Sequence, residues 1–174
     1  MDTLKGSDPI IGFQDEASPQ TTANTVRLWS PEKPRITKNT ARIKANASGF
    51  YAMNGSSVIE FPNSSKKEDM CLFLESVRRW NDDRPIIMIT DNFSVHHSSD
   101  VKKRAAELGI HLVFLPAYSP DLNPIEYIWK SLKRVVSKTR IVDREHMTSV
   151  LEGHFMTEAS KQSYSAHWRA LFLC

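Results

Sequence analysis

Apolar and polar positions along the chain follow two periods, one typical of strands and one typical of helices. Short apolar runs predict strands over 10–14, 50–53, 58–61, 86–89 and 110–114. Apolar residues at helical spacing predict helices over 66–81, 99–108 and 124–138. The segment 143–173 is also expected to be helical, with a break near Ser160. Strands and helices interleave, so the pattern predicts an α/β fold.

Turn and capping residues mark the expected ends of these elements. Asn54-Gly55 predicts a tight two-residue turn between the second and third strands. Ser65 and Glu68 form a capping-box pattern at the start of the first helix, and Asn123 is expected to cap the helix that begins at Pro124. The stripe expected to be buried on the first helix comprises Met70, Phe73, Leu74, Val77 and Trp80.

The unit of strand, helix and strand over 86–114 is expected to be a right-handed parallel crossover. Both of its strands then end at the same edge of the sheet. Asp91 follows the first strand, and the loop after the second leads to Glu126 in the first turn of the next helix. Asp15 ends the strand 10–14. If that strand is parallel and adjacent to 86–89, the three carboxylates converge although 34 residues separate Asp91 from Glu126.

Converging acids repel one another unless cations neutralise them, and oxygen ligands suit Mg²⁺ or Mn²⁺. A pair of such ions would support phosphoryl transfer on nucleic acid. Simpler interpretations of the three acids remain open. Glu126 stands at the capping-box position after Asn123, and Asp15 and Asp91 are each typical of strand-end turns. A carboxylate-pair glycosidase, which needs no metal, is a further alternative.

Composition narrows the class of protein. The 174 residues, 40% of them hydrophobic, suffice for one domain with a buried core. No apolar run is long enough for a transmembrane helix, and the first residues lack the apolar segment of a secretory signal. With only Cys71 and Cys174 there is no disulfide scaffold, so a cytoplasmic setting is expected. Lys and Arg number 23 against 20 acids, which permits nucleic-acid binding without requiring it.

Two uninterrupted motifs stand at the predicted sheet edge: DNFSVH over 91–96 and LPAYSPDLNPIEYIW over 115–129. They closely resemble the catalytic core of DDE transposases, in the bacterial and archaeal insertion-sequence branch of the mariner superfamily. The spacing between Asp91 and Glu126 is similar to the family's usual spacing. FQDE over 13–16, and RLW over 27–29 followed by Pro34, resemble the family's first-acid region more weakly.

The resemblance implies a ribonuclease H-like fold, with a mixed five-stranded sheet and helices on both faces. It implies a catalytic domain over 1–140 and a C-terminal helical tail over 141–174. Asp15, Asp91 and Glu126 would be the catalytic and metal-binding triad, holding two Mg²⁺ or Mn²⁺ ions. The implied reaction is hydrolysis at transposon ends, followed by strand transfer into target DNA. The partner would be DNA, in a cytoplasmic, nucleoid-associated setting.

Further residues near the motifs are candidates for contacts with DNA. Asn92 and His96 either order the site or touch DNA, with a plain turn role as the alternative. Tyr118 shapes the loop before Glu126 and is placed near substrate. Trp129 falls on the apolar stripe and is expected to be core. The basic residues of the same helix that could hold phosphates, or merely face solvent, are Lys130, Lys133 and Arg134.

The chain departs from the family pattern at its start. Asp15 lies only 14 residues after Met1, whereas family members carry an N-terminal helix-turn-helix region. A separate helix-turn-helix polypeptide is therefore an expected partner. A catalytically silent, truncated remnant that only binds DNA or assembles is the alternative function. The apolar stripe of Tyr164, Trp168, Leu171 and Phe172 is expected to pack on the domain's own sheet, with a homodimer contact as the alternative.

Overall fold

The computed structural model describes residues 8–22, 31–32, 41–117, 119–161 and 163–172. Within these ranges the strands are β1 (Ile10–Ala17), β2 (Ala47–Ala52), β3 (Val58–Glu60), β4 (Ile86–Thr90) and β5 (Ile110–Phe114). The α-helices are α1 (Lys67–Trp80), α2 (Ser99–Glu107), α3 (Ile125–Lys138), α4 (Arg144–Ser160) and α5 (Ala166–Phe172). Short 3-10 turns η2 (Ser94–His97), η3 (Pro120–Leu122) and η4 (Ser163–Ser165) connect them. The predicted interleaving of strands and helices is confirmed.

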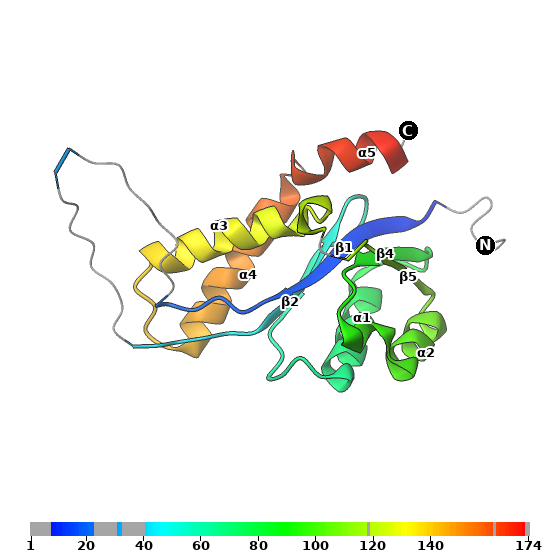
Figure 1. The fold of residues 1–174 in the computed structure, drawn as a ribbon, viewed down its shortest axis with the longest axis horizontal. Helices are drawn as coiled ribbons and strands as arrows, with labels where there is room; N and C mark the ends of the chain where they lie inside the picture. Colours follow the sequence, from blue (N-terminus) through cyan, green and yellow to red (C-terminus); the bar gives the residue numbers. More distant parts are fainter. Residues whose placement is uncertain (1–7, 23–30, 33–40, 118, 162, 173–174) are drawn as a thin grey trace.

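The strands form one mixed sheet in the order β3-β2-β1-β4-β5. β4 runs parallel to both β1 and β5, which confirms the parallel unit, and β2 runs antiparallel to β1 and β3. Helices α1 and α2 lie on one face of this sheet, and α3 and α4 lie on the other (Figure 1). Each face has its own core, because successive side chains of a strand point to opposite sides. Ile10 packs among residues of α1 and α2, whereas Ile11 and Phe13 pack among residues of α3 and α4.

The first strand is longer than predicted. The parallel ladder with β4 reaches Phe13 opposite Ile89, but β1 continues to Ala17. Asp15 therefore lies inside the strand and not at its end, so that expectation is wrong. Beyond Phe13, β1 remains a strand because it stays paired with the antiparallel strand β2, in which Gly49 lies opposite Asp15.

The connection between β2 and β3 is not the predicted tight turn. Phe50 pairs with Val58, so the connecting segment is much longer than two residues. The reason is that the chain after Phe50 stays paired with β1. The Asn54 side chain takes part in this pairing: it accepts a hydrogen bond from the Ile11 amide at 2.8 Å and donates one to the Pro9 carbonyl at 2.9 Å.

Two predicted helix caps are also wrong. No side-chain hydrogen bond caps α1, whose first turn follows Lys66, and the Ser64 hydroxyl instead donates to Asp69. Likewise no side-chain hydrogen bond caps α3. Its N-cap is Pro124, whose ring has no acceptor for the first helix amides and whose nitrogen has no hydrogen for the reciprocal bond of a capping box. The interpretation of Glu126 as a mere capping residue therefore loses its support. Trp80 was expected in the α1 stripe, but it lies at the last turn and is 64% exposed.

The C-terminal helices pack on the α3 side of the sheet. Met147, Leu151 and Phe155 of α4 are fully buried in the same core as α3. The Trp168 ring of α5 lies 5.5 Å from the ring of Phe13, which confirms the expected packing on the domain's own sheet for this residue. The side chains of Leu171 and Phe172 lie outside the described part of the structure. Among the described residues, no helix combines the length and the apolar character needed to cross a bilayer.

Candidate active site

Strand register brings two of the three predicted acids together. Phe13 of β1 lies beside Ile89 of β4 in the parallel ladder. Two residues further along each chain, Asp15 and Asp91 occupy neighbouring positions, with side chains on the α3 face. The alternation that buries Phe13 and Ile89 in that face's core carries both acids to the same side.

The third acid arrives on helix α3. The loop after β5 crosses the edge of the sheet, and its 3-10 turn η3 delivers Glu126 into the first turn of α3. Asp15, Asp91 and Glu126 line one pocket of about 380 Å³. The remaining wall comes from Asn92 and the loop, namely Leu115, Pro116, Ala117, Ser119, Pro120 and Asn123. The predicted convergence of the three carboxylates in space is thus observed.

Burial and crowding perturb the first acid strongly. Burial first, and the negative charges of Glu126 and Asp91 after it, raise the pKa of Asp15 from 3.8 to about 7. The amide of Glu16 and the indole of Trp129 oppose this rise by donating hydrogen bonds to the carboxylate. The repulsion among the three charges follows from their shared position around one pocket.

Asp91 sits in the opposite environment. The His96 side chain holds the pKa of Asp91 below its usual 3.8, with Nδ1 of the imidazole 3.1 Å from Oδ1 of the carboxylate. The backbone amide of Phe93 donates to the same oxygen at 3.0 Å. Two neighbouring aspartates, one with a raised pKa and one with a lowered pKa, are typical of catalytic sites.

His96 is buried, with 2% of its surface exposed, and it belongs to a polar network beneath the pocket. Its Nδ1 lies 3.0 Å from the Thr90 hydroxyl, which donates to the buried Gln14 side chain. Its Nε2 lies 4.0 Å from a carboxylate oxygen of Glu16. This placement favours the ordering role considered for His96 over direct contact with DNA.

The donor set of the pocket fits a hard divalent cation. All three titratable side chains offer carboxylate oxygens, and their mutual repulsion would be relieved by positive charge. Within the described residues, no three His, Cys, Asp or Glu side chains already close around a single point as metal ligands would. The pocket is therefore open, and its fit to a cation rests on donor chemistry and charge.

The other candidate residues differ in how far they are exposed to solvent. Asn92 is exposed; its amide group donates to the Leu115 carbonyl and its oxygen lies 3.0 Å from Nε2 of His97. Lys130 and Arg134 are exposed on α3, and Lys133 is partly buried. Tyr118 lies outside the described residues, as does the 27–29 motif with Pro34.

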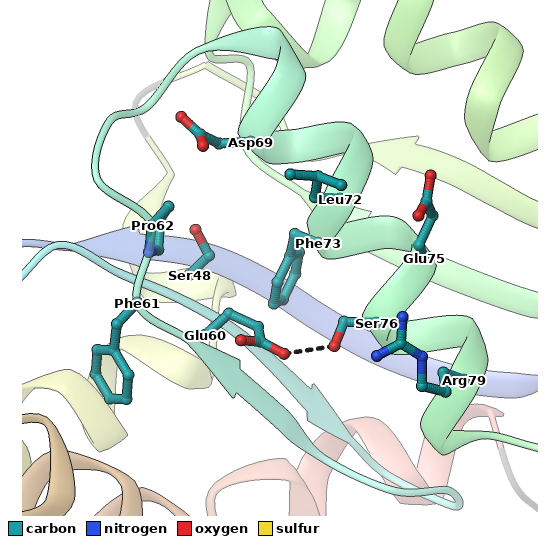
Figure 2. A pocket seen from close by; sticks show the side chains of 10 residues that line it. All are labelled: Ser48, Glu60, Phe61, Pro62, Asp69, Leu72, Phe73, Glu75, Ser76 and Arg79. Carbon is teal, nitrogen blue, oxygen red and sulfur yellow. Dashed lines mark hydrogen bonds between the residues drawn. The ribbon is translucent and has the colours of Figure 1, made fainter.

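A second hollow, of about 280 Å³, lies on the opposite face between the β2–β3 hairpin and α1 (Figure 2). Glu60 of β3 accepts a hydrogen bond from the Ser76 hydroxyl of α1 across this hollow at 2.5 Å. None of the three predicted acids lines it. It is therefore separate from the carboxylate pocket.

Sequence reasoning missed the contacts of two side chains at the site. Trp129 is buried in the core, as predicted, but its indole N–H also donates to Oδ2 of Asp15 at 3.0 Å. The apolar stripe gave no sign of this contact, because periodicity fixes the face of a helix and not the partner of a ring nitrogen. The Gln14 side chain was also missed, although a polar residue inside an apolar strand was a usable signal.

Comparison with known proteins places this arrangement in a family. Residues 11–148 match the family model described as DDE superfamily endonuclease. The Tc1 transposase of Caenorhabditis elegans is 32% identical over 84 residues, which cover 47% of this chain and 31% of that protein.

Solved structures of the Mos1 transposase share the fold. The mariner Mos1 paired-end complex with Mg is 18% identical, with a TM-score of 0.69, and covers 92% of this chain and 52% of the Mos1 chain. The Mos1 strand transfer complex is 19% identical, with a TM-score of 0.62, over 87% of this chain and 51% of that chain. The present chain thus spans about half the length of the Mos1 chains in these two complexes. The mixed sheet with helices on both faces is the ribonuclease H-like fold of these catalytic domains, and the chain belongs to the DDE superfamily endonuclease family.

Proposed function

We propose that this chain is the catalytic portion of a transposase, which cleaves DNA phosphodiester bonds at transposon ends and transfers the strand into target DNA. The observation that carries the proposal is the pocket lined by Asp15, Asp91 and Glu126 on adjoining elements of the fold. Family membership supplies the reaction class, because it is that of an endonuclease.

In this proposal the three carboxylates hold two Mg²⁺ or Mn²⁺ ions. When bound, such ions would polarise the scissile phosphate and increase the acidity of the attacking water or hydroxyl. Asp15 and Asp91 would approach the ions from neighbouring strands and Glu126 from the helix. Phe93 and His96 would keep Asp91 ionised and fixed, since both donate hydrogen bonds to the same carboxylate oxygen.

DNA would enter along the exposed side of α3. Lys130 and Arg134 project from the helix that carries Glu126, and the Lys130 ammonium lies 5.1 Å from the centre of the half-exposed Tyr127 ring. Basic side chains beside an exposed aromatic ring suit a nucleic-acid backbone and an adjacent base. We include Lys133 in this surface, and Asn92 at the rim of the pocket.

The test is nicking of a DNA duplex by the purified chain with Mn²⁺. We expect wild-type protein to nick, and Asp91→Asn to abolish nicking while its thermal unfolding stays cooperative. Asp121→Asn is the matched control, because Asp121 is an exposed acid on the neighbouring loop outside the pocket. Its nicking rate should stay within about twofold of wild type.

Two results would count against the proposal. Nicking that survives Asp91→Asn would remove the triad assignment. A wild-type chain that binds DNA but never nicks it, with either cation, would favour the catalytically silent alternative. Supplying a helix-turn-helix polypeptide separately would then show whether end recognition restores cleavage.

A further inference from the structure

The indole of Trp129 links the helix of the third acid to the first acid. Trp129 stands one turn after Glu126 on α3 and is only 1% exposed. Its Nε1 donates to Oδ2 of Asp15 at 3.0 Å. A buried indole N–H needs an acceptor, but here the acceptor is a carboxylate of the pocket and not a backbone carbonyl. A hydrogen bond to one named oxygen fixes the rotation of the Asp15 carboxylate.

A glycine on the neighbouring strand makes room for this contact. Asp15 pairs with Gly49 across β1 and β2, so the two positions are side by side on the α3 face. A Cβ atom at Gly49 would lie 2.8 Å from Cζ2 and Cη2 of Trp129 and 3.1 Å from Ile125. The edge of the indole therefore lies against bare backbone, beside the acid that its N–H reaches.

We propose that Trp129, seated over Gly49, is a positioning residue that presents Asp15 for cation binding. The inference rests on the proposed function, since it assumes that Asp15 is a metal ligand. Partners that orient a ligand from behind strengthen metal binding by holding it in the productive rotamer. In addition, the indole bond links Asp15 to the helix that carries Glu126, so it also fixes the separation of these two ligands.

The experiment compares three variants by Mn²⁺ dissociation constant, read from the electron paramagnetic resonance signal of free Mn²⁺. Trp129→Phe removes the donor and keeps most of the packing. Gly49→Ala keeps the donor and displaces the ring. Phe155→Leu is the matched control, because the centre of the Phe155 ring lies 5.6 Å from that of the Trp129 ring and a hydrocarbon side chain has no N–H to donate to Asp15. Unfolding in EDTA measures the stability of each variant separately.

We expect Trp129→Phe to weaken Mn²⁺ binding roughly 10- to 100-fold, the range found for lost partners of metal ligands. Gly49→Ala should weaken it in the same direction if it folds, and Phe155→Leu should stay within about twofold while losing stability. Equal weakening by Trp129→Phe and Phe155→Leu would show that only core packing matters, and this would overturn the inference.

The outcome for wild-type protein separates this inference from the proposed function. If wild-type protein binds Mn²⁺ and Trp129→Phe binds it equally well, the positioning role is overturned and the proposed function stands. If wild-type protein binds no Mn²⁺ and Asp15→Asn changes nothing, the proposed function fails and the inference fails with it.

Discussion

Asp15→Asn should stabilise the metal-free protein. Burial, with the charges of Glu126 and Asp91, raises the pKa of Asp15 from 3.8 to about 7. Each unit of pKa difference between folded and unfolded chains corresponds to about 1.4 kcal/mol, so ionised Asp15 costs the fold at most about 4 kcal/mol. Partial solvent contact reduces this cost, and we expect a gain of about 2 kcal/mol at pH 8. The amide oxygen of Asn can still accept the Trp129 hydrogen bond.

The raised pKa of Asp15 determines how the stability gain of Asp15→Asn depends on pH. The folded state binds the Asp15 proton more tightly than the unfolded chain, so ionisation destabilises the fold as the pH rises from about 4 to about 7. The gain from Asp15→Asn should therefore be near zero at pH 4, grow across this window, and level off above it.

Urea unfolding in EDTA, at several pH values between 4 and 8, measures this gain. Asp121→Asn is again the control and should shift the free energy of unfolding by less than about 0.5 kcal/mol at any pH. A gain of equal size at pH 4 and pH 8, or a loss at pH 8, would refute the electrostatic explanation. Adding Mn²⁺ at pH 8 should stabilise wild type and not Asp15→Asn.

Three further predictions concern other parts of the molecule. Glu158→Gln should lower the free energy of unfolding at pH 7 by roughly 1–2 kcal/mol. The Lys161 ammonium, 2.7 Å away, holds the pKa of the buried Glu158 below its usual 4.5, so in urea melts this difference should vanish as the pH falls through the lowered pKa. Gly109→Ala should cost about 1 kcal/mol by the same assay, because Gly109 has φ +65°, whereas the added methyl would make only an ordinary contact, at 3.9 Å, with Nη2 of Arg78. Lys130→Gln combined with Arg134→Gln should weaken binding to any duplex and reduce the salt slope in fluorescence anisotropy by about 2; an unchanged slope would remove α3 from the DNA surface.

The part of the site that sequence could predict follows from strand alternation and topology. Apolar runs placed Asp91 at a strand end, and the parallel unit placed the Glu126 loop at the same edge of the sheet. Asp15 was placed correctly at that edge even though its strand was predicted to end too early. Alternation and parallel pairing are properties of the backbone, so they can be read from residue types alone.

The missed features depend on contacts between distant segments. Asn54-Gly55 has the local signal of a tight turn, but pairing of the chain with β1 determines the connection. Ser65 has a capping signal, but no side chain caps the helix that follows. The Trp129 bond to Asp15 depends on the room left by Gly49 of β2, which β3, α1, β4, α2 and β5 separate from α3 along the chain. Local preferences of this kind are worth about 1 kcal/mol each, so tertiary packing overrides them.

The most direct test of the central claim is an anomalous diffraction map from crystals grown with Mn²⁺. We expect Mn²⁺ density within about 2.0–2.6 Å of carboxylate oxygens from Asp15, Asp91 and Glu126. Density elsewhere on the protein, with this pocket empty of Mn²⁺ or filled by a lysine or arginine side chain, would contradict the claim that these three acids form a cation site.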